Sequence, residues 1–189
     1  MLLKDYFPNI NKKFENIFFS GISFDTSMVK KNDIFFAIKG NKNDGSKFIS
    51  NAIKKGSKII ISEKKISKPR NGILFINTKN IRKLLAEVSF RIYGNRPKNL
   101  IAVTGTNGKS SIADFYYQIL KLNNIKVASI GTLGVKSNKM NINLSNTTIN
   151  PIKLGKILNK LKDQNVDNVI MEASSHGLEQ NRLDGLQFN

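Results

Sequence analysis

A glycine-rich turn at residues 104–111, Thr-Gly-Thr-Asn-Gly-Lys-Ser-Ser, is the segment best suited to chemistry. An apolar run at residues 100–103 precedes it and an amphipathic helix pattern follows. Glycines let backbone N–H groups close around phosphate oxygens, at which a following helix directs its positive end. Lys109 would reach the outer phosphates, and the Ser110 hydroxyl would coordinate Mg²⁺. The spacing predicts a phosphate-binding loop, although the standard pattern would need glycine at Val103; the alternative is an ordinary strand–turn–helix with a surface lysine.

Two further side chains could take part in chemistry. Glu172 ends the apolar run at residues 169–171, and parallel sheets present ligand-binding groups at the carboxyl ends of their strands. Its carboxylate could hold Mg²⁺ directly or through water, or it could be a surface glutamate at a strand end. His176 is the only histidine, and we interpret it as a supporting residue rather than a reacting one.

Composition limits the classes of protein that need consideration. Hydrophobic residues make up 40% and charged residues 23%, which is typical of a globular chain. The absence of cysteine excludes disulfides, thiolate metal sites and a cysteine nucleophile. No apolar run approaches the ~20 residues of a membrane span, and the N-terminus lacks the apolar core of a signal peptide. We therefore expect a cytoplasmic, monomeric protein without membrane contact.

The net charge of +18 raises the possibility of a polyanionic partner. The lysines are scattered along the chain, as at Lys54, Lys64 and Lys121, rather than gathered in one tail. We interpret them mainly as a solvated surface and expect no nucleic-acid partner. A basic nucleic-acid-binding module remains the alternative, and it predicts duplex binding with a steep salt dependence.

Strand-like and helix-like segments alternate along the 189 residues, which predicts the α/β class with a parallel sheet in the second half. Gly94 and the sequence Asn95-Arg96-Pro97 form the best linker, so we place a small α/β domain at 1–96 and a second domain at 97–189. Strands are expected at residues 17–24, 34–38, 58–62, 73–76, 100–103, 127–130 and 169–171.

Helices are expected where apolar residues recur at helical spacing. One begins at Asp44-Gly45-Ser46 and ends at Gly56, and a second covers residues 81–92. The helix after the glycine-rich turn is expected to bury Ile112, Phe115, Tyr116, Ile119 and Leu120. Asn150 and Pro151 predict the N-cap and first residue of another helix.

The glycine-rich turn resembles the T-G-T-N-G-K-[TS]-[TS] loop of the Mur ligases, ATP-dependent amide-forming enzymes of peptidoglycan synthesis. Related amide ligases such as folylpolyglutamate synthase carry similar loops. Residues 24–40 narrow the choice, because they are similar to the D-S-R-x-V-x-x-G-D-L-F-x-A-x-x-G element of the domain that binds the nucleotide sugar. The resemblance implies a substrate domain followed by the first part of a parallel-sheet, P-loop-type ATP-binding domain.

Three shorter motifs resemble the Mur ligases that add the third residue of the peptide. Residues 171–178 look like M-E-x-S-S-H-G-L, residues 146–148 match N-T-T, and residues 131–134 match G-T-x-G. The resemblance implies ligation of a diamino acid, meso-diaminopimelate or L-lysine, to UDP-N-acetylmuramoyl-L-alanyl-D-glutamate through an acyl phosphate. A Mur ligase that adds the terminal dipeptide, or another amide ligase of the superfamily, remains the alternative.

The resemblance also implies roles for individual residues, with ATP and Mg²⁺ as cofactors. Lys109 and Glu172 would be catalytic, and Ser110 and Glu172 would lie at the metal. ATP would be bound by Gly105, Thr106, Asn107, Gly108, Lys109, Ser110 and Ser111. The UDP-sugar dipeptide would be bound by Phe24, Thr26, Asn41, Lys42, Asn43, Asn146, Thr147, Thr148, Ser174, Gln180 and Arg182.

The sequence departs from the family pattern in places. Ser27 stands where the family usually has arginine, and Asn32 replaces a glycine, which asparagine can do in a left-handed turn. The family's chains continue well beyond 189 residues, through a D-H-x-D-Y-H element and an amino-acid-selecting domain. We therefore expect this sequence to be an N-terminal fragment that lacks ligase activity on its own.

Overall fold

The computed structural model describes residues 1–7, 10–40, 43–64 and 71–189, in two compact units, Met1–Val88 and Ser89–Asn189. Helix α3 (Ile81–Ile92) begins in the first unit and ends in the second. The boundary near residue 96 stays a prediction. Two predicted substrate-binding residues, Asn41 and Lys42, lie outside the described residues. Within the described ranges, no helix is long and apolar enough to cross a bilayer.

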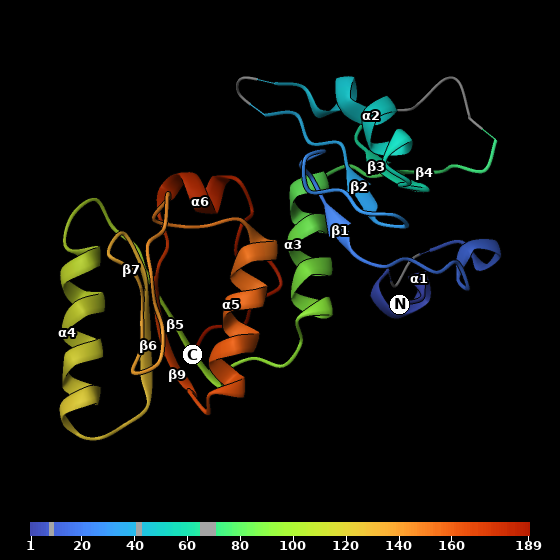
Figure 1. Cartoon of the computed structure of the whole chain (residues 1–189). Helices are drawn as coiled ribbons and strands as arrows, with labels where there is room; N and C mark the ends of the chain where they lie inside the picture. Colours follow the sequence, from blue (N-terminus) through green and yellow to red (C-terminus); the bar gives the residue numbers. More distant parts are fainter. Residues whose placement is uncertain (8–9, 41–42, 65–70) are drawn as a thin grey trace. The chain divides into compact units, whose positions relative to one another are not determined.

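The first unit is built on a four-stranded parallel sheet in the order β1-β2-β3-β4 (Figure 1). Its strands are β1 (Ile22–Ser23), β2 (Ile34–Phe36), β3 (Ile59–Ser62) and β4 (Leu74–Asn77). Every residue of β1, β2 and β3 is buried, as expected for parallel strands covered on both faces. The first predicted strand is much shorter than residues 17–24, although Phe18 forms an isolated bridge with Leu2.

Short helical segments complete this unit: α1 (Leu3–Tyr6), η1 (Lys12–Phe14), η2 (Gly45–Phe48) and α2 (Ile49–Lys54). The predicted helix from Asp44 forms as η2 followed by α2, and Gly56 ends it with φ of +95°. Asn32 adopts φ of +64°, so it does occupy the left-handed turn that its type allows. Ala52 of α2 packs with Phe35 and Ile60 in the core.

The second unit has a five-stranded sheet in the order β5-β9-β6-β7-β8. Strands β5 (Asn99–Val103), β9 (Asn168–Glu172) and β6 (Val127–Gly131) are parallel, which confirms the predicted α/β class. Two antiparallel strands that we did not predict, β7 (Gly134–Lys136) and β8 (Asn141–Ile142), extend the sheet beyond β6. β9 is thus the central parallel strand, with β5 on one side and β6 on the other.

Helices α4 (Lys109–Leu122) and α5 (Pro151–Asp163) lie on opposite faces of this sheet, and α6 (Ser175–Glu179) follows β9 (Figure 1). The predicted start of α5 is confirmed, because Asn150 accepts the Lys153 backbone N–H and Pro151 is the first helical residue. Four large side chains of α5 face the core: Leu154, Ile157, Leu158 and Leu161.

The predicted core face of α4 is wrong. Phe115 is 63% exposed, Ile119 58% and Ile112 53%, and the residues that α4 buries are Ala113 and Tyr117. Tyr116 and Leu120 are half-buried at the edges of this contact. The exposed apolar residues and the buried ones both recur at helical spacing. Periodicity alone therefore does not tell which face of α4 contacts the sheet. The small side chain of Ala113 lets the helix pack closely against β6 and β9, which leaves the larger apolar side chains outside.

Candidate functional site

The glycine-rich turn joins the carboxyl end of β5 to the first residue of α4, the position that a phosphate-binding loop requires. Gly105 has φ of +143° and Gly108 has φ of +81°, values that residues with a Cβ rarely adopt. Residues 104–108 are exposed. The first N–H groups of an α-helix have no partner within the helix, so those of α4 are donors for an anion at this loop.

Lys109 is folded back over the loop. Its Nζ donates to the carbonyl oxygens of Gly105, at 2.5 Å, and Thr106, at 3.3 Å. The ammonium group therefore lies at the mouth of the loop, and among the described residues it is held only by main-chain oxygens. A phosphate could replace these two acceptors without the breaking of an ion pair.

Glu172 lies at the centre of the site, where three segments meet. It is the last residue of β9 and only 3% exposed. Its Oε2 accepts the Ser110 Oγ–H and the Thr132 Oγ1–H, each at 2.9 Å, and its Oε1 accepts the Thr132 N–H at 2.9 Å. Ser110 follows β5 and Thr132 follows β6, so strand order alone brings both beside Glu172. Both oxygens of the buried carboxylate thereby have hydrogen-bond donors.

Gly131 leaves the space that Glu172 occupies. A Cβ on Gly131 would overlap the carboxylate and the Cγ of Glu172. The two-residue turn after it, Thr132-Leu133, closes the β6–β7 hairpin at Gly134, which has φ of +90°. The G-T-x-G motif therefore builds a tight turn that carries donors to the carboxylate.

Thr148 joins Glu172 to the segment after it. The Thr148 hydroxyl is buried, donates to the Glu172 main-chain oxygen at 2.9 Å and accepts the Ser174 backbone N–H at 2.9 Å. It also lies 3.1 Å from Ser174 Oγ. Ser174 caps α6 by accepting the Gly177 N–H. The N-T-T and S-S-H-G segments are thus fixed to each other.

Arg182 is oriented by this same group. Its Nη1 donates to the Thr148 carbonyl, and its Nε and Nη2 both donate to Gln180 Oε1, at 3.1 and 2.8 Å. The other end of the Gln180 amide lies 2.8 Å from His176 Nε2. Because Gln180 Oε1 accepts from Arg182, its Nε2 is the donor and His176 Nε2 the acceptor. His176 therefore holds the amide that in turn holds the guanidinium, and its supporting role stays a prediction.

The predicted uridine-binding residues lie in the first unit, at the carboxyl ends of β1 and β2. Phe24 is 38% exposed, Thr26 is half-buried and Asn43 is exposed. Phe24 and Thr26 stand in a turn in which Asp25 accepts the Ser27 N–H at 2.8 Å. The Gly40 N–H donates to the Asn43 carbonyl oxygen at 2.8 Å. Because β1 and β2 are parallel neighbours, the segments that follow them begin at one edge of their sheet.

Asp44, beside Asn43, accepts from Ser46 and pairs with Lys64. The backbone N–H and hydroxyl of Ser46, together with Lys64 at 3.1 Å, hold the pKa of Asp44 well below its ordinary value of 3.8. Its carboxylate therefore stays charged at neutral pH.

Several predicted residues of the second unit come together and others do not. One hydrogen-bonded group, which also includes His176 and Thr132, contains seven of the predicted residues: Ser110, Glu172, Thr147, Thr148, Ser174, Gln180 and Arg182. Asn146 is exposed and bonds to neighbouring Ser145. Thr132 and Gly131 were not predicted as site residues, although the G-T-x-G motif after a buried strand was a visible signal.

The oxygen donors beside the loop suit a magnesium ion. Hydroxyl and carboxylate oxygens are the ligands that Mg²⁺ prefers, and Ser110 Oγ and Glu172 Oε2 lie 2.9 Å apart. Within the described ranges, no three His, Cys, Asp or Glu side chains gather to hold a metal.

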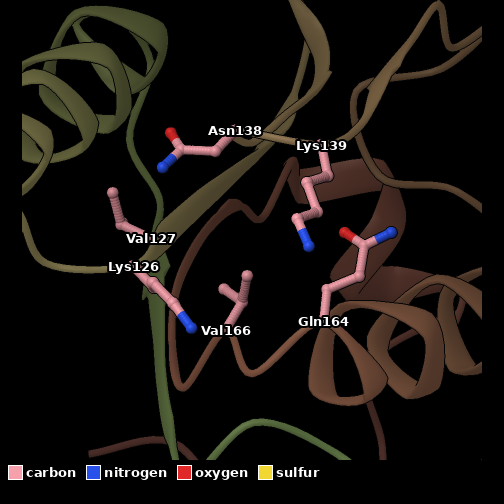
Figure 2. A pocket seen from close by; sticks show the side chains of 6 residues that line it. All are labelled: Lys126, Val127, Asn138, Lys139, Gln164 and Val166. Atoms are coloured by element: carbon pink, nitrogen blue, oxygen red, sulfur yellow. The ribbon is translucent and has the colours of Figure 1, made fainter.

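A separate pocket lies at the opposite end of β6, lined by Lys126, Val127, Asn138, Lys139, Gln164 and Val166 (Figure 2). Its volume is about 60 Å³, and Gln164 Oε1 is buried without a hydrogen-bond partner among the described residues. This space suits a few water molecules rather than a nucleotide. The phosphate loop and Glu172 are at the other edge of the sheet.

Two family models match the sequence. The description "Mur ligase family, catalytic domain" applies to residues 19–93, and "Mur ligase middle domain" applies to residues 103–189. The UDP-N-acetylmuramoyl-L-alanyl-D-glutamate–2,6-diaminopimelate ligase of Rickettsia montanensis is 37% identical over 185 residues, which cover 96% of this chain and 38% of that protein. The chain therefore spans little more than a third of the length of this relative.

Solved structures show the same likeness. A structure of UDP-N-acetylmuramoyl-L-alanyl-D-glutamate–2,6-diaminopimelate ligase matches with a TM-score of 0.84 at 26% identity, covering 100% of this chain and 39% of that one. MurF ligase from Thermotoga maritima, solved in complex with ADP, matches with a TM-score of 0.50 at 24% identity, covering 82% and 32%. The second likeness concerns the fold alone.

Proposed function

The chain belongs to the Mur ligase family, and from this premise we propose that it supplies the ATP-binding and UDP-sugar-binding parts of an amide ligase. The ligase would join a diamino acid to UDP-N-acetylmuramoyl-L-alanyl-D-glutamate. The observation that carries the proposal is the contact between Ser110, at the start of α4, and buried Glu172, at the end of β9. It places a hydroxyl and a carboxylate beside a phosphate loop.

The glycine-rich loop would bind the phosphates of ATP. Its backbone N–H groups and the N-terminus of α4 would face the phosphate oxygens, and Lys109 would leave Gly105 and Thr106 to bind the outer phosphates. Ser110 and Glu172 would hold Mg²⁺, which supplies charge neutralisation at the phosphoryl group. These residues would keep the terminal phosphate at the edge of the sheet where β5, β6 and β9 end.

The reaction needs a carboxylate of the substrate next to that phosphate. Transfer of the terminal phosphoryl group to the D-glutamate carboxylate oxygen would release ADP and form an acyl phosphate. Attack by the amine of the diamino acid would then form the amide bond and release phosphate and a proton. Arg182 suits the substrate end, because a guanidinium pairs strongly with carboxylates and here it is held in place by Gln180 and the Thr148 carbonyl.

Binding of the sugar nucleotides tests the function and its alternatives. Calorimetric titration should show that UDP-N-acetylmuramoyl-L-alanyl-D-glutamate binds more tightly than the same molecule without D-glutamate. Arg182→Ala should weaken binding of the complete substrate about 10- to 100-fold, the usual value of a charged hydrogen bond. Arg91→Ala, an exposed arginine of α3, is the matched control and should leave affinity unchanged.

Three results would contradict the proposal. Equal affinity for the sugar nucleotide with and without its D-glutamate would show that the chain does not recognise D-glutamate, and would contradict the proposed substrate. Preference for the UDP-muramoyl tripeptide would favour the dipeptide-adding ligase. Tight binding of random duplex DNA with a steep loss in salt would favour the nucleic-acid alternative that the charge of +18 raises.

A further inference from the structure

We propose that Thr132 is a positioning residue for the metal-binding carboxylate Glu172, and that its hydroxyl links Glu172 to Thr147 on the substrate side. This inference rests on the proposed function, because it concerns a carboxylate beside a Mg²⁺–nucleotide complex. The G-T-x-G motif at residues 131–134 matches the family pattern, but the resemblance implies no role for the Thr132 side chain.

The contacts show that Thr132 holds Glu172 at both oxygens. Its backbone N–H donates to Oε1 at 2.9 Å and its hydroxyl donates to Oε2 at 2.9 Å. The only other side-chain donor to this carboxylate among the described residues is Ser110. Two bonds from one residue fix the rotation of the carboxylate, which one bond would not do. The Oε2 lone pairs are thus held in the direction of Ser110.

The number of hydroxyl hydrogens shows which of the residues in this series, Thr147, Thr132 and Glu172, donates to the next. A hydroxyl has one hydrogen, and a carboxylate can only accept, so the Thr132 hydroxyl donates to Glu172. Thr147 Oγ1, at 3.0 Å from Thr132 Oγ1, must then be the donor to Thr132. The order is Thr147 to Thr132 to Glu172, with Ser110 donating from the other side.

This order has a consequence for ligand binding. A substrate group that accepts from Thr147 would withdraw its hydrogen from Thr132 and so alter the contact with Glu172. Thr132 is exposed whereas Glu172 is buried. A change at Thr147, on the substrate side, would therefore reach the buried carboxylate through the Thr132 hydroxyl. Nucleotide–metal binding and substrate binding would thereby be coupled.

The experiment measures how much Mg²⁺ increases the affinity of this chain for ATP, by titration of ATP with excess Mg²⁺ and with EDTA. Thr132→Val keeps the shape and the backbone N–H but removes the hydroxyl. It should reduce the Mg²⁺-dependent gain about five- to tenfold and leave the affinity in EDTA unchanged, a smaller factor than for a lost direct charged hydrogen bond because Thr132 acts on the metal only through Glu172. Thr132→Ser should restore the gain.

Thr147 gives a second, independent measurement. Thr147→Val should lower the same gain by a smaller factor in the otherwise unchanged chain and have no further effect in Thr132→Val, because its hydroxyl reaches Glu172 only through Thr132. Thr78→Val, at the end of the other sheet, is the matched control and should match the unchanged chain. Thermal unfolding of each variant, together with Thr132→Ala as a smaller replacement, separates this effect from loss of folding.

The outcomes separate the two proposals. A Mg²⁺-dependent gain that Thr132→Val retains in full, or equal losses in ATP affinity with Mg²⁺ and with EDTA, would overturn the role of Thr132 alone. Additive effects of the Thr132 and Thr147 changes would overturn the link between them. The absence of any gain from Mg²⁺ in the unchanged chain would overturn both the proposed nucleotide site and the role of Thr132.

Discussion

At the scale of single residues, the site depends on one buried carboxylate and the small residue that makes room for it. Glu172 accepts from Ser110 and twice from Thr132, so its burial carries no unpaired oxygen. Burial of a carboxylate without such partners would be costly. The neighbouring main chain can approach because Gly131 has no side chain. The geometry of the predicted metal site is therefore set by a glycine as much as by its ligands.

Gly131→Ala tests this. The new methyl group would overlap the Glu172 carboxylate, so the side chain must leave Ser110 and Thr132. We expect a destabilisation of about 1–3 kcal/mol, typical of overpacking, in urea-induced unfolding. The Mg²⁺-dependent part of ATP affinity should be lost in the same variant.

Gly72→Ala serves as the control for the change itself, because, apart from its two chain neighbours, no atom of the described residues lies within 4 Å of a Cβ at Gly72. Its positive φ of +77° still disfavours alanine, so some loss of stability is expected there without any change in nucleotide affinity. An alanine at 131 that left both stability and the effect of Mg²⁺ intact would contradict the packing described.

The positions of the glycine-rich loop and of Glu172 at strand ends could be predicted from sequence, because each follows an apolar run, whereas their ligands stay a prediction. Thr132 could not, because its role depends on β6 lying beside β9, and the order of strands in a sheet is not written in local patterns. Gln180 and Arg182 were predicted from the resemblance, whereas the contact that orients them through His176 required the coordinates.

At the scale of elements, α4 shows where periodicity fails. Its apolar residues divide into a small buried set and a large exposed set, and the sequence favoured the large one. By contrast, the start of α5 was predicted correctly, because a capping asparagine and a proline fix its first turn. β7 and β8 were missed because two- and three-residue strands carry little alternation.

Substitutions on α4 distinguish its two faces. Phe115→Glu should change the free energy of unfolding by no more than about 0.5 kcal/mol, since the side chain is 63% exposed. Tyr117→Ala, at a ring that is 9% exposed, should cost about 3–5 kcal/mol. Denaturant unfolding of the two variants gives both values. If Phe115→Glu lowered the free energy of unfolding as much as Tyr117→Ala, this would contradict the structure and show that the larger apolar face of α4 lies in the core.

At the scale of the whole chain, the length tells how much of a Mur ligase is present, and the net charge tells which kind of ligand the surface favours. The chain spans 38% of the length of the Rickettsia relative, so the activity and substrates of the whole ligase stay proposals for it. The charge of +18 suits anionic ligands, and ATP and a UDP-sugar are both anions. A general attraction to anions would not depend on one lysine, whereas ATP binding at the proposed phosphate loop would depend on Lys109.

Equilibrium binding of Mg²⁺–ATP to the chain and to Lys109→Met is therefore the most direct test. Lys156→Met, at an exposed lysine of α5, removes the same charge elsewhere. We predict that the unchanged chain and Lys156→Met bind Mg²⁺–ATP alike and that Lys109→Met binds about 10- to 100-fold more weakly, the usual value of charge-assisted hydrogen bonds. Equal binding by all three proteins, or no binding by the unchanged chain, would contradict the assignment of residues 104–111 as the ATP-binding loop.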